Sequence, residues 1–381
     1  MPHAASTPVR VAIVGAGAVS DYHHVPGLAL DPRAKLSVVC DLNADLADER
    51  REAWSALRAD WAGLRTSTDP EATCRDPEVD AVILATPNFT HCPLSQAAAA
   101  AGKHVMCEKP LGLNAAEVAA MYRAAEAANV VHMTAFTYRF APSMRYLRHL
   151  LRSGQLGEPR HFRSQRFLDL PETSWGWRQY KAQAGAGDLF DMTIHRIDFA
   201  LDLLGPLAKV CGAVAQYAPR TQTAAGEPCP RSEVDDWSCL IGEFASGAFG
   251  VWEGTTLAKG YHRSGFGHEW AEINGSEASA VYRLHDPNHL LLGREGGDLE
   301  QVAVPAEFLK PADSPRDENS GEPATVFRYD LAWEFITAIV AGRHALPSYR
   351  DGWQAQVIAD AVLESHAQRR WVEIPQGDAW R

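Results

Sequence analysis

The sequence predicts an α/β protein in which a doubly wound parallel sheet is followed by a second α/β domain with a mostly antiparallel sheet. Short β-branched runs alternate with Ala-rich helical stretches from residue 9 to about residue 137. After about residue 138, strand-like runs follow one another without helices between them. The 381 residues exceed the roughly 100–200 residues of a typical domain. We therefore expect two domains, covering residues 1–137 and 138–381.

The first domain is predicted from five near-continuous apolar runs that alternate with helical stretches. Parallel strands covered by helices on both faces have this composition, because neither face of the sheet meets water. The strand candidates are residues 9–16, 35–41, 80–86, 103–109 and 130–136, and the helical stretches include 43–59, 92–101 and 115–128.

The second domain begins with a helical stretch at 142–153, which leads into EPRHFRSQRFL, and a second helix runs from near Gly187 to about Leu204. Five alternating or β-rich runs then succeed one another, which favours antiparallel pairing. These runs lie at 208–217, 235–244, 247–256, 268–276 and 279–284, with Ala-Ser-Gly as a hairpin signal between the second and third. The polar, Pro- and Gly-rich stretch 310–325 is predicted to be a surface loop, and helices at about 328–341 and 351–370 close the chain.

Composition and charge exclude several classes of protein. Apolar residues make up 46% and charged residues 22%, which is typical of a globular protein and not of a disordered one. The formal net charge of −12 would repel phosphate backbones, so we expect no nucleic-acid partner. No apolar run approaches the roughly 18–20 residues that cross a bilayer, so we expect no membrane partner. Seven scattered cysteines without a C-x-x-C pair favour reduced thiols and a cytoplasmic location.

A glycine-rich turn, GAGAVS at residues 15–20, follows the first predicted strand and opens a helix. Gly15 and Gly17 permit a tight turn and a close approach of the backbone to a pyrophosphate at the helix N-terminus. Ser20 stands at the third glycine of the G-x-G-x-x-G fingerprint, where a small residue suffices for close packing. Asp41, 24 residues after Gly17, ends the second strand and can bind a ribose diol while repelling a 2′-phosphate. The pattern predicts an NAD site, with NAD preferred over NADP; the alternative is a glycine turn without a ligand.

Two further segments lie at the ends of predicted strands in the first domain. TPNFTH, Thr86 to His91, comes after the strand DAVILAT, and Glu108-Lys109-Pro110 ends the next strand. Ligands of open α/β sheets bind beyond the carboxyl ends of the strands, so we expect both segments at the cleft. Pro110 keeps Lys109 out of helical geometry, which defines where its side chain emerges. Taken alone, this tripeptide is more typical of a surface lysine paired with a glutamate.

Asp191 and His195 lie four residues apart in GAGDLFDMTIH, on one face of a predicted, largely buried helix. Such a pair can be poised for proton transfer, although taken alone it is more often a helix salt bridge. His195 has no second histidine or cysteine at zinc spacing, so we expect no metal site. The segment Trp175-Gly-Trp177-Arg178 precedes this helix. An aromatic ring beside an arginine suits a sugar, and a packing role is equally compatible.

In this order and spacing, GAGAVS, Asp41, TPNFTH, EKP and GAGDLFDMTIH resemble the motifs of the Gfo/Idh/MocA oxidoreductases. The similarity also includes AFTYRFAPS, LRSGQLGEPRHF, VDDWSCLIGEFASGAFG and DGWQAQVIADAVLES, so it covers nearly the whole chain. The resemblance implies a Rossmann domain, a second domain with a large, open, mostly antiparallel sheet, and a homodimer or homotetramer formed through the open face. It implies NAD(P)-dependent oxidation of a secondary hydroxyl of a sugar, glycoside, anhydrosugar or cyclitol. VVHMTAFTYRF and SWGWR look similar to members that act at C3 of a pyranose.

The same resemblance assigns roles to residues of this chain. Lys109, Asp191 and His195 would be catalytic. The cofactor would contact Gly15, Gly17, Ala18, Val19, Asp41, Thr86, Asn88, His91, Glu108 and Lys109. The substrate would contact Tyr138, Arg139, Trp177 and Arg178 together with the three catalytic residues. Ser20 and Thr193, where many members carry glycine, are the departures from the family pattern.

For this chemistry we expect His195 to accept the hydroxyl proton with an ordinary pKa of about 6.5. Asp191 would orient and stabilise the imidazolium, and Lys109 would stabilise the developing alkoxide. A swap in which Lys109 takes the proton itself stays open. The alternative functions are a redox-neutral, NAD-dependent glycosidase of the same family and a non-catalytic NAD(P)-binding sensor. A sensor would be expected to lose Lys109 or His195, and this chain keeps both.

Overall fold

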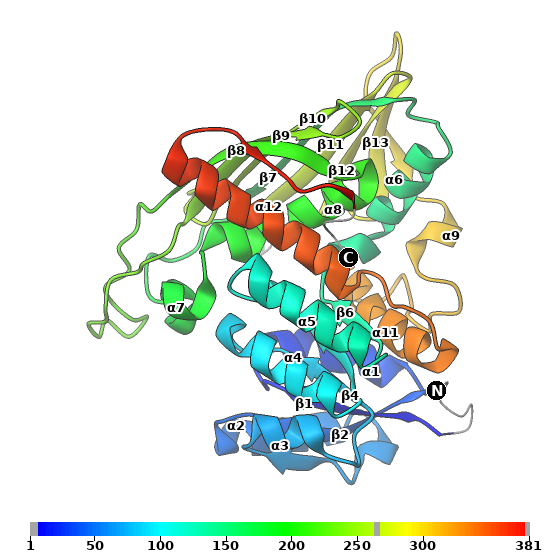
Figure 1. Cartoon of the computed structure of the whole chain (residues 1–381). Coiled ribbons are helices and arrows are strands. Elements are labelled where there is room, and N and C mark those ends of the chain that lie inside the picture. The colour runs from blue at the N-terminus through cyan, green and yellow to red at the C-terminus, as the bar shows by residue number, and fades with distance from the viewer. Residues whose placement is uncertain (1–6, 263–266, 378–381) are drawn as a thin grey trace.

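Figure 1 shows the computed structural model of the chain, which describes residues 7–262 and 267–377. A six-stranded sheet lies in the lower half of the view and a nine-stranded sheet in the upper half. Helix α12 (Tyr349–Gln368), drawn in orange to red, runs diagonally between them. The predicted fold class, a parallel sheet followed by a mostly antiparallel one, is confirmed.

The six-stranded sheet has the order β3-β2-β1-β4-β5-β6, and all of its described strand pairs are parallel. Because the order reverses between β1 and β4, a crevice opens beyond the carboxyl ends of these two strands. The strands are β1 (Val9–Val14), β2 (Ala34–Cys40), β3 (Arg65–Ser67), β4 (Ala81–Leu84), β5 (His104–Cys107) and β6 (His132–Thr134). The helices between them are α1 (Val25–Leu30), α2 (Ala44–Ser55), α3 (Pro70–Arg75), α4 (His91–Ala100) and α5 (Ala115–Ala127).

Polar residues just before three of these helices explain where the helices begin. The side chains of Asn43, Asp69 and Asn114 accept hydrogen bonds from backbone N–H groups in the first turns of α2, α3 and α5. Such N-caps satisfy donors that have no partner within the helix. The apolar strands β1 and β4 are almost entirely buried, as expected for strands between two helical layers.

The nine-stranded sheet has the order β14-β13-β12-β11-β7-β10-β9-β8-β15, in which β7 and β10 are parallel and the other described pairs antiparallel. Helices α6 (Pro142–Arg152) and α8 (Ile194–Leu204) pack against it. In β10, Trp252 is buried whereas Phe249 and Val251 are exposed, so the second face of the sheet is open. The strands are β7 (Pro159–Phe167), β8 (Leu207–Ala215), β9 (Trp237–Phe244), β10 (Phe249–Thr255), β11 (His268–Gly275), β12 (Ala278–Arg283), β13 (His289–Arg294), β14 (Glu300–Ala303) and β15 (Val372–Glu373).

The C-terminal helices join the two sheets. Helix α11 (Asp330–Ala341) packs against α1, and α12 packs against α5, α8 and β8. Gly352 of α12 permits the close approach, because a Cβ there would lie 2.4 Å from Cδ1 of Leu111. The two halves of the chain are therefore held together by a segment that comes last in the sequence.

Several short elements lie outside the sequence prediction. The edge strand β3 has three residues and largely exposed side chains, so no apolar run reveals it. The 310–325 stretch leads through irregular structure into α10 (Pro323–Val326), but it is not entirely a surface loop, since Ser314 and Arg316 are buried and bind Asp330. Helices α7 (Lys181–Ala184) and α9 (Ala306–Leu309) are single turns. Within the described ranges, no helix combines the length and apolar character needed to span a bilayer.

Candidate active site

The crevice at the reversal of strand order belongs to a cavity of about 940 Å³. This volume is at the upper end of the range of small-molecule sites, roughly 300–1,000 Å³, and suits an extended ligand with a second molecule beside it. Most of the predicted site residues line it, namely Gly15, Gly17, Ala18, Val19, Asp41, Thr86, Asn88, Glu108, Lys109, Tyr138, Trp177, Arg178, Asp191 and His195.

The glycine-rich turn packs tightly on one side and is open on the other. Gly15 has a φ of +98°, and a Cβ there would lie 2.4 Å from the carbonyl oxygen of Ala85, so no other residue fits without a shift. The hydroxyl of Ser20 donates a 2.6 Å hydrogen bond to the carbonyl oxygen of Gly15, which braces the turn from within. A Cβ at Gly17 would meet no atom within 4 Å. The backbone at Gly17 thus faces open space, where a phosphate group can approach.

The carboxylate of Asp41 lies at the end of β2, beside this turn. Its two oxygens accept hydrogen bonds of 2.9 Å from the backbone N–H groups of Ala16 and Asn43, which orient the carboxylate. Asp41 also lines the cavity, so a diol can reach it. An acidic group next to an open glycine turn is the donor and acceptor set that a dinucleotide needs. The residues present therefore fit NAD.

Lys109 and Asp191 come from different halves of the chain and meet in the cavity. Lys109 follows β5, and Asp191 lies in the π-helical turn η6 (Leu189–Thr193) that precedes α8. The Nζ of Lys109 donates hydrogen bonds of 2.5 Å to the carbonyl oxygen of Asp191 and 2.8 Å to its Oδ1. Burial raises the pKa of Asp191, but the charges of Lys109 and Arg178 more than offset this and leave the pKa below its ordinary value. Asp191 is therefore a carboxylate that fixes the position of the Lys109 side chain.

His195 lies in the first turn of α8 and is only 7% exposed. The rings of Tyr138 and Phe136 pack edge-on against it, with centroids 4.7 and 5.7 Å away. Its Nδ1 has no hydrogen-bond partner among the described residues. Burial, and then the nearby charge of Lys109, lowers the pKa of His195 well below 6.5. His195 is therefore a neutral imidazole in the wall of the cavity, with Nδ1 buried and unpaired among the described residues.

These observations correct two expectations about the pair. Asp191 does not pair with His195 as expected from their i, i+4 spacing; its carboxylate binds Lys109 instead, whose Nζ lies 2.8 Å from Oδ1. The expected ordinary pKa of His195 is also wrong, since the histidine is buried beside cations.

Two family models match the chain: an oxidoreductase family with an NAD-binding Rossmann fold at residues 9–136, and the GFO/IDH/MocA C-terminal domain at residues 144–281. The chain is 30% identical to levoglucosan dehydrogenase of Pseudarthrobacter phenanthrenivorans over 97% of its own length and 98% of that protein. The chain belongs to the Gfo/Idh/MocA family. It is an NAD-binding oxidoreductase.

Further members of the Gfo/Idh/MocA family support this result. The chain is 28% identical to myo-inositol 2-dehydrogenase of Thermotoga maritima over 97% of its own length and 99% of that protein. A solved structure of levoglucosan dehydrogenase in complex with NADH and L-sorbose is 29% identical and superposes with a TM-score of 0.87, covering 97% of this chain and 99% of that one. The family thus includes enzymes named for sugars and for cyclitols.

Two residues assigned from the family resemblance have other tasks in this Gfo/Idh/MocA chain. His91 is completely buried, does not line the cavity, and places its ring nitrogens 2.9 Å from the carbonyl oxygen of Pro110 and 2.8 Å from that of Thr86. Arg139 is 8% exposed and pairs with Asp198 and Asp351. His91 therefore joins two loops, and Arg139 joins α8 to α12; neither lines the cavity.

The remaining predicted residues connect the cavity wall to its support. Asn88 donates a 2.9 Å hydrogen bond to the carbonyl oxygen of Ala184 in the second half of the chain. An oxygen of Glu108 lies 2.8 Å from Nε2 of His24. The guanidinium of Arg178 stacks 4.5 Å from the ring centre of Trp177. Thr86 accepts a 2.6 Å hydrogen bond from Thr90 in the same wall.

Arg328 and Arg166 also line the cavity but were not among the sequence candidates. The guanidinium of Arg328 lies 5.1 Å from the ring centre of Tyr138. Arg166 comes from β7 and pairs with Glu269 at 3.3 Å. Neither arginine belongs to a local motif, so only the folded structure places them beside His195.

Proposed function

We propose that the protein is an NAD-dependent dehydrogenase that oxidises a secondary hydroxyl of a pyranose sugar, glycoside, anhydrosugar or cyclitol to a ketone. The observation that carries the proposal is one cavity whose wall contains the glycine turn and Asp41 as well as Lys109, Asp191 and His195. NAD, when bound, accepts the hydride from the carbon that carries the hydroxyl. The similarity to enzymes named levoglucosan dehydrogenase and myo-inositol 2-dehydrogenase supports this substrate class.

His195 is the proposed base. Its low pKa keeps the imidazole neutral near pH 7 and the ring lines the cavity, so it can accept the hydroxyl proton. Lys109 donates hydrogen bonds to the substrate oxygen and stabilises its negative charge as the carbon–hydrogen bond breaks. Asp191 holds Nζ of Lys109 in place through a 2.8 Å hydrogen bond.

The preference for NAD over NADP rests on Asp41. A 2′-phosphate beside this carboxylate would bring two negative groups together, whereas a ribose diol donates hydrogen bonds to it. The seven cysteines, none of which forms a disulfide, support a location in the reducing cytoplasm.

We further propose a homodimer or homotetramer formed through the open face of the nine-stranded sheet. Ile241, Phe249 and Val251 are 43%, 44% and 38% exposed on β9 and β10, and an apolar patch of this kind usually meets a partner. Light scattering at micromolar concentration measures the mass, and a monomer would refute the assembly.

The decisive experiment measures NADH formation over a panel of pyranoses, anhydrosugars, glycosides and inositols. A dehydrogenase forms NADH in step with a ketone. Turnover of a glycoside without added NAD, by protein purified with its cofactor, would favour the redox-neutral glycosidase instead. NAD binding without turnover of any compound in the panel would leave the non-catalytic sensor.

A further inference from the structure

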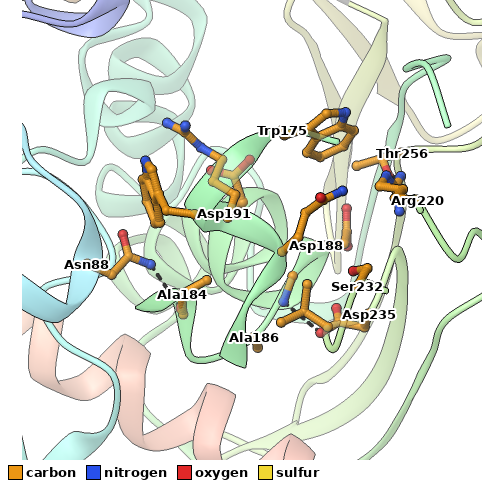
Figure 2. Close-up of a pocket in the computed structure, with 15 residues that line it drawn as sticks. Asn88, Trp175, Ala184, Ala186, Asp188, Asp191, Arg220, Ser232, Asp235 and Thr256 are labelled. Carbon is orange, nitrogen blue, oxygen red and sulfur yellow. Dashed lines mark hydrogen bonds between the residues drawn. The ribbon is translucent and has the colours of Figure 1, made fainter. Parts of the chain in front are cut away.

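A second, smaller cavity of about 30 Å³ adjoins the active site. It shares Asn88, Trp177, Arg178 and Asp191 with the wall of the large cavity. Figure 2 shows it between Asn88, Ala184 and Asp191 on one side and Trp175, Arg220 and Ser232 on the other. These four residues therefore form a wall common to the two cavities, so the smaller one lies next to the site of Lys109 and Asp191.

The wall of this cavity contains buried polar atoms that no described residue satisfies. Five side-chain atoms have no hydrogen-bond partner among the described residues: both amide atoms of Gln179, Oδ1 of Asp188, Oγ of Ser232 and Nε of Arg220. All four residues are only 1–3% exposed. Buried polar atoms are normally paired, so such a concentration in one place indicates a polar ligand or ordered water.

The paired atoms of Asp188 and Arg220 hold these two side chains in position. Asp188 accepts hydrogen bonds at Oδ2 from Thr193 at 3.0 Å and from Ser238 at 2.7 Å, which leaves Oδ1 as its unpaired atom. Arg220 donates to Asp236 at 3.2 Å and stacks 4.5 Å from the ring centre of Trp175. Asp188 and Arg220 are thus fixed in the cavity wall before anything enters the cavity.

The volume limits what the cavity can take. One water molecule needs roughly 10–15 Å³ measured in this way, so 30 Å³ holds about two waters, or two non-hydrogen atoms of a substituent. A second sugar ring is far too large. A hydroxymethyl group has two such atoms: its carbon suits the apolar atoms of Trp175, Val234 and Ala186, and its hydroxyl suits the unpaired polar atoms.

We propose that this cavity is a substrate subsite for the exocyclic hydroxymethyl group of a hexopyranose. The inference rests on the proposed function and narrows its substrate class. Gln179, Asp188 and Ser232 bind the hydroxyl, and Trp175 contacts the methylene. The enzyme therefore prefers hexopyranosides to pentopyranosides, which are identical except that they lack this group.

Two matched pairs of methyl glycosides test the subsite: β-D-glucopyranoside against β-D-xylopyranoside, and β-D-galactopyranoside against α-L-arabinopyranoside. A site built to bind a hydroxyl rejects the analogue without it, so we expect kcat/KM with NAD to be at least about tenfold higher for the hexose of the accepted pair. Ser232→Leu blocks the cavity and should bring the hexoside down to the level of the pentoside, whose own kcat/KM stays unchanged.

Ser143→Ala is the matched control, because Ser143 is also a buried serine without a partner for its hydroxyl in the described structure but lines neither cavity. It should leave the hexoside-to-pentoside ratio unchanged. If Ser232→Leu does not fold, two measurements still test the subsite. One is the hexoside-to-pentoside ratio of kcat/KM in the wild type, and the other is the same ratio in Ser232→Ala, which should be lower. Equal kcat/KM within the accepted pair, or an equal loss on both sugars in the Ser232 variants, would mean that the cavity only holds structural water. Absence of NADH from every sugar of the wider panel would instead overturn the proposed function, and the subsite with it.

Discussion

Replacing Lys109 by methionine removes one ammonium group from a site in which that group has two hydrogen bonds. Its Nζ lies 2.5 and 2.8 Å from the two oxygens of Asp191 that it contacts, and its side chain is 12% exposed. A preorganised donor in such a shielded place typically contributes 10²–10³-fold to kcat, and acid–base groups contribute up to about 10⁴-fold. We therefore expect Lys109→Met to lower kcat by about 10²–10⁴-fold, or about 3–5 kcal/mol.

The same variant should move the pH profile. The charge of Lys109 is the largest influence after burial that lowers the pKa of His195. Without that charge the pKa rises towards 6.5, although burial keeps it lower. A base acts when it has lost its proton, so kcat/KM rises with pH through this pKa. The acid limb of the profile should thus shift to higher pH in Lys109→Met.

The assay is NADH formation on the accepted sugar between pH 5 and 9. Lys103→Met is the matched control, because Lys103 is a buried lysine whose Nζ donates to the carbonyl oxygen of Val79 away from the cavity. NAD affinity should change little in Lys109→Met. His195→Ala should cost a similar factor in kcat, and the double variant should be barely worse than either single one. Near-wild-type kcat in Lys109→Met would refute the assignment; a rate in His195→Ala that still rises on the alkaline side would make Lys109 the base.

Three further outcomes are expected. Wild-type kcat/KM should be at least about tenfold higher for NAD than for NADP, about 1.4 kcal/mol, and Asp41→Ala should reduce that ratio; equal use by the wild type would contradict the role of Asp41. Burial raises the pKa of Asp188 to about 7, so the folded protein holds a proton between about pH 4 and 7 that the unfolded chain has lost, and stability falls as pH rises through this range. Asp188→Asn removes that loss of stability, which is up to about 4 kcal/mol. The Tm of the variant minus the Tm of the wild type should therefore be larger at pH 8 than at pH 5, and a Tm difference that does not depend on pH would contradict this. Arg139→Met should lower the stability by about 3–5 kcal/mol, because it leaves Asp198 unpaired, with KM unchanged in the folded enzyme; an altered KM without a change in Tm would restore Arg139 to the substrate site.

The sequence predicts those strands and helices whose side chains follow a regular pattern of burial and exposure. A strand such as β4, which lies between two helical layers, must be apolar throughout, and β9 and β10 show the alternation of a sheet with one open face. An edge strand such as β3 does not need an apolar or alternating sequence, because its side chains are largely exposed to water. The π-helical turn η6 is equally hidden, since its residues have the composition of an ordinary helix.

The same limit applies to the candidate site. A motif shows that a residue stands near the cleft, but it does not show which way the side chain points. Lys109 points into the cavity, whereas His91 points away from it towards two carbonyl oxygens. Arg139 follows Tyr138 directly in the chain, yet it pairs with three carboxylates and does not line the cavity. Arg328 reaches the site only through tertiary packing, for which no local pattern exists.

The position of α12 has a consequence for the synthesis of the chain. Its contact with α5 can begin to form only when Tyr349 has emerged, about 220 residues after α5 ends. At roughly 5–20 residues per second, that interval lasts about 10–45 s on the ribosome. During it, the part of α5 that contacts α12 stays uncovered while the nine-stranded sheet forms. A nascent chain that stops before Tyr349 would therefore expose this surface permanently, and chaperone binding to such truncated chains would be expected to persist after release.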